Sequence, residues 1–465
     1  MEKIYITRVR MITIFLITQT ILGFQFKVYL IASCLPENRY SGMIRDSISS
    51  DHSPDDGLLK RERSRITQKG MPFIEQLLGI AERENINSIS GQVPSGLIDI
   101  HFIEENLKPD ELLLEYYISD SMLYIFSLSK YSSFLYRGYL NLQVRPMLEK
   151  FRKHLKSAEM DGLAPLCQEM YALLILPVYH LLLGTRRLII IPGKELSGLP
   201  FEAFIRTDDN QTGSAFCNRR FLIYDYEITY HYSAMQWAAQ QQFVINSGRV
   251  GAGQDQKYDF MGFSPVFCEN PKVNPLPESA KELILIGDLF QQQGLSSWIV
   301  YEQASRKEVF RSLAGTSRIL HLATHIAPGF EHNDGAAFLF WDYNPCERQG
   351  EEGKGMLTMK EIGGMRLENE LIVLNACASG SFRKYSSGKM ASFALSFMLA
   401  GGRNILSTLW NISDSQAFTF IVDFYRHLLS GKTYSQALRA VKIKMIQRKE
   451  TSLPTLWAAY VLMGE

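Results

Sequence analysis

The chain has 465 residues, and its 49 Lys and Arg residues nearly balance 48 Asp and Glu residues, for a net charge of +1. With no long basic run in the sequence, this balance argues against nucleic-acid binding. Apolar residues make up 46% and charged residues 21% of the chain, as is ordinary for a folded protein. The length exceeds what one simple hydrophobic core holds, so we expect two or three domains.

The six cysteines are scattered and include no CxxC pair. This pattern predicts neither a zinc site nor a disulfide framework, and it favours a reducing compartment. We therefore expect a cytoplasmic protein that holds no metal or other cofactor.

Residues 1–34 differ in composition from the rest of the chain. Basic residues precede an apolar stretch, and small residues follow it up to Cys34, as in a secretory or lipoprotein signal. Gln25 and Lys27 interrupt the apolar stretch, which leaves it short for a membrane span. Two interpretations stay open, a signal or membrane anchor and an amphipathic or buried segment. We expect membrane contact only if the segment is an anchor.

Residues 35–70 are rich in Ser, Asp, Arg and Lys and predict a linker. Residues 71–185 are predicted to form a smaller α+β region. Its expected elements, in chain order, are a helix at 71–84, a hairpin of strands at 112–118 and 122–128, and helices at 144–157 and 163–183.

From residue 186 to residue 465, strand patterns alternate with helix patterns. Strands are expected at 187–192, 259–264, 298–301, 319–325, 371–376 and 404–410, and helices at 279–293, 305–313, 388–400, 415–429 and 434–449. A loop-rich stretch covers 327–364, and an apolar stretch covers 457–463. The alternation indicates an α/β fold with a mostly parallel sheet and helices on both of its faces.

Two of the expected strands end in chemically active side chains, His325 and Cys377. In open α/β sheets, groups just past the carboxyl ends of parallel strands form the site. His325 precedes Cys377 by about fifty residues, close to the separation in caspase-type cysteine proteases. The pair therefore predicts a cysteine peptidase, in which a base helps the thiol to become the attacking thiolate.

The residues around Cys377 are small, which lets a substrate backbone approach closely and lets nearby N–H groups hold an oxyanion. A buried structural thiol is the alternative for Cys377. His321 lies four residues before His325 and on the same side of the strand, but away from the strand end, so we expect it to be a buried residue behind the site. The two histidines lack the glutamate of an HExxH motif, and we expect no zinc here.

Trp410 and Asp414 follow the next expected strand. A carboxylate beside the site would bind a basic P1 side chain, Arg or Lys, through paired hydrogen bonds. Asp414 also directly precedes a helix pattern, so a capping role is an alternative, and the two roles are compatible. The polar stretch after the cysteine contains Arg383 and Lys384, where we weigh a solvent-exposed turn against a self-cleavage loop.

Taken in order, several motifs resemble the CHAT domain, a caspase-like domain related to separases in peptidase clan CD. The motifs are His321-Leu-Ala-Thr-His325, Leu374-Asn-Ala-Cys-Ala-Ser-Gly380, Ser407-Thr-Leu-Trp410 with Asp414, the closing stretch Trp457 to Glu465 and, upstream, Leu188 to Ala203 and Tyr224 to Tyr230. The resemblance covers roughly residues 107–465 and implies a caspase-like three-layer sandwich.

The resemblance implies that Cys377 is the nucleophile and His325 the base of a Cys–His dyad. It also implies that the segment from Trp410 to Asp414 lies near a P1 pocket for Arg or Lys. Family members usually carry glycine after the base, where its N–H helps to form the oxyanion hole. Here Ile326 takes that place, and the backbone N–H groups of Ile326 and Cys377 are the expected oxyanion donors.

Two functions stay open at this point, and a third, a membrane-anchored effector, depends wholly on residues 1–34. The first is a cysteine endopeptidase that cleaves a protein substrate and is regulated by a protein partner. The second is a catalytically silent module of the same fold that serves interaction or signalling. The tetratricopeptide repeats that the family often carries are not evident in this sequence, so recognition is expected to come from residues 71–180 or from another chain.

Overall fold

The computed structural model describes residues 100–119, 121–157, 161–209, 216–247, 256–266, 273, 275–327, 336–343, 354–376, 379, 383–384 and 390–465. The expected signal or anchor at 1–34, the linker at 35–70 and the helix at 71–84 lie outside these residues. Among the residues described, no helix is both long and apolar enough to span a bilayer.

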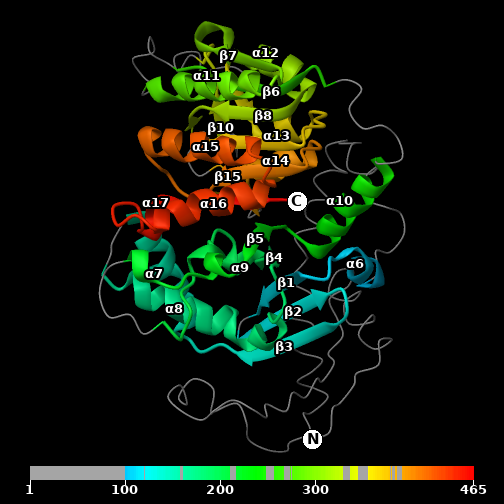
Figure 1. The fold of residues 1–465 in the computed structure, drawn as a ribbon, viewed down its shortest axis with the longest axis vertical. Coiled ribbons are helices and arrows are strands. Elements are labelled where there is room, and N and C mark those ends of the chain that lie inside the picture. Colours follow the sequence, from blue (N-terminus) through cyan, green and yellow to red (C-terminus); the bar gives the residue numbers. More distant parts are fainter. Residues whose placement is uncertain are drawn as a thin grey trace, which may run out of the picture.

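One large sheet organises the described residues. Its eleven strands there follow the order β3-β2-β1-β4-β5-β16-β15-β12-β8-β6-β7. Their bounds are β1 Glu111–Ile118, β2 Met122–Ser129, β3 Ser133–Tyr139, β4 Arg187–Ile191, β5 Glu227–Tyr230, β6 Tyr258–Ser264, β7 Ser297–Tyr301, β8 Ser317–Ala323, β12 Leu371–Asn375, β15 Asn404–Thr408 and β16 Tyr460–Met463. The sheet runs along the long axis of the molecule, with β7 and β3 toward opposite ends (Figure 1).

The sheet consists of two parallel blocks. Strands β1, β4 and β5 form one block, and β15, β12, β8, β6 and β7 form the other. Strand β16 joins them, because it pairs antiparallel with β15 and, through Met463 and Tyr230, parallel with β5. The hairpin of β1 and β2 continues into a third antiparallel strand, β3.

Helices cover both faces of the second block. On one face, α11 Pro277–Gln292, α15 Asp414–Leu429 and α16 Tyr434–Ile446 pack against Ile319, Leu371 and Val373. On the other face, α12 Lys307–Leu313, α13 Met359–Gly363 and α14 Phe393–Leu399 pack against Leu320 and Leu374. Successive strand residues therefore alternate between two buried faces. The predicted mixed α/β class, with a large and mostly parallel sheet flanked by helices, is confirmed.

The other helices are α6 Ile100–Asn106, α7 Val144–Ser157, α8 Leu163–Leu174, α9 Gly193–Leu196, α10 Ala234–Ser247 and α17 Pro454–Trp457. The helix expected over 163–183 is wrong in its second half. There the α-helix stops at Leu174 and a 3₁₀ helix runs from Leu176 to Leu181. Pro177 explains the change, because its ring clashes with the preceding turn and it has no N–H to donate.

A buried charged cluster connects β5 of the first block to α16. Lys442 of α16 is fully buried, and its Nζ donates to Oε1 of Glu202 at 2.7 Å. The second carboxylate oxygen of Glu202 accepts from the hydroxyl of Tyr230 on β5. Burial lowers the pKa of the Lys442 ammonium, and the Glu202 carboxylate opposes this shift. The charges are kept in the interior because each has a partner.

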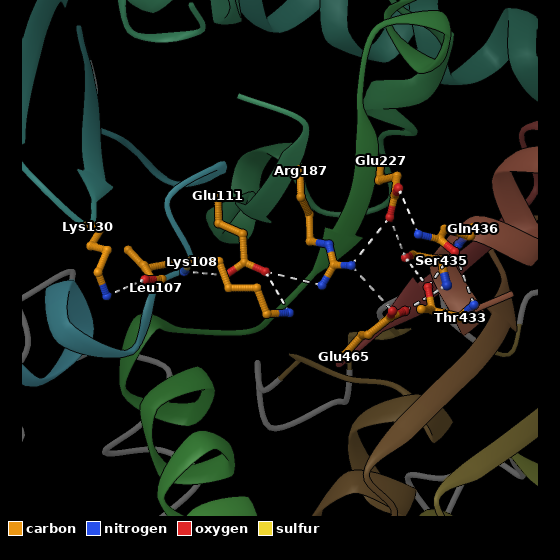
Figure 2. Close-up of polar contacts among 10 residues, drawn as sticks. All are labelled: Leu107, Lys108, Glu111, Lys130, Arg187, Glu227, Thr433, Ser435, Gln436 and Glu465. Carbon is orange, nitrogen blue, oxygen red and sulfur yellow. Dashed lines mark hydrogen bonds and ion pairs between the residues drawn. The ribbon is translucent and has the colours of Figure 1, made fainter. Parts of the chain in front are cut away.

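A second charged cluster lies at the amino ends of β1, β4 and β5 (Figure 2). The Arg187 guanidinium lies 3.2 Å from Glu111, 3.4 Å from Glu227 and 3.6 Å from Glu465. Glu465 also accepts the N–H of Ser435 at 2.7 Å. The cluster thereby connects the first block of strands to the start of α16.

His231, just after β5, gives the protein a stability that depends on pH. The side chain is 1% exposed, and burial lowers its pKa to about 4. Between pH 6.5 and 4 the unfolded chain binds a proton at this site and the folded chain does not, so the free energy of unfolding falls as the pH falls.

Glutamine does not titrate, so we expect the free energy of unfolding of His231→Gln to fall on acidification by roughly 3 kcal/mol less than that of the wild type. Urea unfolding of both proteins at pH 7.5 and pH 4.5 measures it. All other titrating groups are shared, so they cancel in the comparison. An equal loss in both proteins would contradict the assignment.

Candidate active site

Three neighbouring strands end together at one edge of the sheet. Ala323, the last residue of β8, pairs with Asn375, the last residue of β12. On the other side of β12, Val373 pairs with Leu406 of the parallel strand β15. The segments that follow these strands therefore start from a common edge, as parallel pairing requires.

His325 follows β8 by two residues, and the structure fixes its backbone. The His325 carbonyl accepts the N–H of Leu339 at 3.0 Å, and the buried Thr324 hydroxyl donates to the Leu339 carbonyl. Leu339 belongs to β10 Ala337–Leu339, the middle strand of a small sheet with β9 Ile326–Ala327 and β11 Met356–Thr358. This clamp places a half-buried imidazole at the edge of the sheet.

Ile326 lies opposite Phe338 in the pairing of β9 with β10. Because Leu339 donates to the carbonyl of His325, Ile326 occupies a non-hydrogen-bonded position of this antiparallel ladder. Its N–H therefore points away from β10, while its side chain packs against the main core.

Cys377 lies outside the described residues, but Ala376 before it and Ser379 after it are held by hydrogen bonds. The Ala376 carbonyl accepts the hydroxyl of Thr408 at 2.7 Å. The buried Ser379 hydroxyl donates to the carbonyl of Leu374 at 3.0 Å and accepts the N–H of Thr408 at 3.2 Å. The end of β15 thus holds the chain just before and just after the cysteine.

Asp414 is the first residue of α15, and Ser413 caps that helix with its side chain. The Asp414 carboxylate instead accepts the N–H of Glu278, at the start of α11, at 3.1 Å. Burial raises the pKa of Asp414, and the negative charges of Glu282 and Glu278 add to this rise. The Glu278 N–H and the nearby His325 oppose the rise, so Asp414 and His325 are electrostatic neighbours.

The family follows from comparison with known proteins. The CHAT domain matches residues 164–465, more than half of the chain. The chain belongs to the CHAT domain family. Human tetratricopeptide repeat protein 28 is 23% identical over 216 residues, which are 41% of this chain and 8% of that protein. The chain therefore spans a small fraction of this curated relative.

Two solved structures resemble this CHAT protein distantly. The Saccharomyces cerevisiae separase–securin complex is 12% identical with a TM-score of 0.45, covering 78% of this chain and 30% of the other. The complex of Porphyromonas gingivalis RgpB pro- and mature domains is 11% identical with a TM-score of 0.40, covering 68% and 71%.

The remaining predicted site residues have different surroundings. Trp410 is 4% exposed, and its indole N–H donates to the Thr455 carbonyl at 3.0 Å, so this side chain is part of the CHAT core. Arg383–Lys384 form β13, which pairs with β14 Met390–Ala391. Within the described ranges, no group of three or more His, Cys, Asp or Glu side chains could hold a metal ion.

The sequence reasoning missed the residues that hold the site of this CHAT protein in place. Thr324 precedes the histidine, Ser379 follows the cysteine by two residues, and Thr408 ends β15. Their hydroxyls all bond to backbone groups at the strand ends. A small hydroxyl residue at the end of a buried strand was the available signal.

Proposed function

We propose that this CHAT protein is a cysteine endopeptidase in which Cys377 is the nucleophile and His325 is the base. The observation that carries the proposal is the register of β8 and β12. Ala323 pairs with Asn375, and His325 and Cys377 each follow their member of this pair by two residues. This register supports the proposal because the chain leaves two adjacent strand ends at the same height, from which an imidazole and a thiol would reach one substrate carbonyl.

The proposed reaction begins with proton transfer from the thiol of Cys377 to His325. The thiolate then bonds to the carbonyl carbon of the scissile peptide, and the oxyanion is held by backbone N–H groups, including that of Ile326. His325 gives its proton to the leaving amine as the C–N bond breaks. Water, deprotonated by His325, next attacks the thioester, which releases the acid and restores the thiol. A protein partner that orders the loops around the site would regulate this reaction.

The P1 preference is proposed to be Arg or Lys. Asp414 is an electrostatic neighbour of His325 and is only partly buried. Its carboxylate would favour a basic substrate side chain and disfavour an acidic one.

We expect Asp414→Asn to lower kcat/KM for a peptide with P1 Arg by roughly 10- to 100-fold, because the charge-assisted contact is lost. A matched peptide with P1 Gln should change little. Asparagine keeps an oxygen for the Glu278 N–H, so the fold is preserved. Ser413→Ala is the control, since it removes the cap of α15 but leaves the carboxylate. Equal losses for both peptides would contradict a P1 role.

Labelling with an arginyl peptide fluoromethyl ketone tests the nucleophile. We expect covalent labelling of the wild-type protein, none of Cys377→Ala, and wild-type labelling of Cys217→Ala, which removes a partly exposed thiol elsewhere. Label that remains on Cys377→Ala would overturn the assignment. A wild-type protein that stays inert with both label and substrate would favour the silent interaction module.

A further inference from the structure

Behind the candidate site lies a buried polar cluster that the proposed reaction does not use. Glu282 of α11 is 1% exposed, and its carboxylate faces β8 and β12. The Asn375 Nδ2 lies 3.0 Å from both carboxylate oxygens, and Nε2 of His321 lies 3.2 Å from Oε1. One side chain from a helix thus contacts two adjacent strands of the sheet.

Two tyrosines complete the cluster and orient its members. The Tyr460 hydroxyl on β16 donates to Oδ1 of Asn375 at 2.8 Å, which turns the amide NH₂ toward Glu282. The Tyr425 hydroxyl on α15 lies 3.3 Å from Nδ1 of His321. Burial and the charge of Glu282 both raise the pKa of Tyr425, so that phenol stays neutral.

The position of the cluster relates it to the dyad. His321 lies in β8 four residues before His325, and Asn375 ends β12 two residues before Cys377 in the sequence. Both cluster residues are on the face of α11 and α15, because Ile319 and Val373, two residues earlier in the same strands, pack in one core with these helices. Glu282 also adds to the negative charge that raises the pKa of Asp414, so the cluster and the edge of the sheet are electrostatically connected.

Stability alone does not explain a carboxylate at this place. Burying a charge costs free energy, and well-packed apolar residues often do as well or better than a buried ion pair. A carboxylate gives directional contacts that apolar packing lacks: here it accepts from the Asn375 amide of β12 and lies 3.2 Å from Nε2 of His321 on β8.

We infer that Glu282 is a positioning residue for the candidate dyad: its buried carboxylate holds together the two strand ends that carry His325 and Cys377. The inference rests on the proposed function for its catalytic consequence. Independently of any catalytic activity, β8 and β12 are expected to loosen together when Glu282 is changed.

Glu282→Gln tests both parts, and Glu202→Gln is the matched control, a second buried carboxylate that contacts Tyr230 and Lys442 instead. Amide hydrogen exchange measures the structural claim. We expect exchange at 319–327 and at 371–376 to rise at least about tenfold in Glu282→Gln but to stay at the wild-type rate in Glu202→Gln. Wild-type exchange in Glu282→Gln would overturn the inference.

Steady-state kinetics on a P1 Arg peptide measures the catalytic claim. We expect Glu282→Gln to lower kcat by at least about tenfold with KM within about twofold, because misplacement of reacting groups by a fraction of an ångström affects the transition state most. Glu202→Gln should retain the wild-type kcat. If the wild type turns over and Glu282→Gln has the same kcat, the inference fails and the proposed function stands. If the wild type is inert, the proposed function fails and the exchange result decides the inference.

Tyr460→Phe keeps the test available if Glu282→Gln does not fold. It removes the hydroxyl that orients Asn375 and leaves the charge in place. We expect a smaller rise of exchange confined to 371–376 and a smaller loss of kcat. Tyr230→Phe, which removes a hydroxyl from the other buried carboxylate, should change neither. A Tyr460→Phe protein with wild-type exchange and kcat would overturn the inference as well.

Discussion

His325→Gln is expected to lower kcat for a P1 Arg peptide by roughly 10³-fold, within the range for loss of a general base. Glutamine has a similar reach and polarity, but it cannot take the thiol proton or return it to the leaving amine. The backbone clamp from Leu339 and Thr324 does not involve the imidazole, so the fold should stay intact. Initial rates near neutral pH, with circular dichroism as a check of folding, measure the effect.

The control for this substitution is His101→Gln, which changes an exposed histidine on α6, outside the matched CHAT region. We expect it to have the wild-type rate. A His325→Gln protein that keeps a rate within about threefold of wild type would show that the base lies elsewhere.

Lys442→Met is expected to be the most destabilising single substitution considered, at about 3–5 kcal/mol. Methionine fills the space of the lysine stem, but Glu202 is then left as a carboxylate at 2% exposure without its cation. The loss should appear as a lower urea midpoint with an unchanged slope.

A double variant separates the unpaired charge from lost packing. Adding Glu202→Gln to Lys442→Met removes the charge and keeps an oxygen for the Tyr230 hydroxyl, so most of the stability should return. Glu202→Gln alone should cost less than Lys442→Met, because burial already lowers the pKa of Lys442, so an unpaired ammonium there loses its proton more readily than in water. A double variant as unstable as Lys442→Met would refute an electrostatic origin.

Much of the fold could be predicted because many elements carry a clear local signal. The helix expected at 144–157 has the observed bounds, and the hairpin of β1 and β2 has the expected strands. The helix expected at 388–400 was too long, since α14 begins only at Phe393, after the cap Ser392.

Other elements could not be predicted because distant contacts define them. Strand β3 contains seven residues of intermediate or high exposure and has no apolar alternation, so its pairing with β2 is what makes it a strand. The stretch 327–364, expected to be loop-rich, contributes β10, β11 and α13, and the first two are only three residues each. The apolar stretch at 457–463 gave no sign that β16 lies in the middle of the sheet.

In the candidate site too, local sequence signals were predictable and contacts between distant segments were not. The sequence indicated His325 and Cys377 at strand ends, and their mutual geometry remains a prediction. It did not reveal that Asp414 accepts the N–H of Glu278, because α11 and α15 are far apart along the chain. Nor did it reveal Glu282, whose carboxylate contacts Asn375 of β12 and His321 of β8, both distant from α11 along the chain.

The place of β16 has a consequence for how this protein reaches its native state. Until Tyr460–Met463 pairs, β5 and β15 each present an open strand edge. Strand β16, which covers both edges, is synthesised after both of these strands. Contacts of such long sequence separation slow folding, and unpaired edges invite intermolecular pairing meanwhile. We therefore expect partly synthesised chains to depend on chaperones, and substitutions in β16 to lower the yield of folded protein more than they lower its final stability.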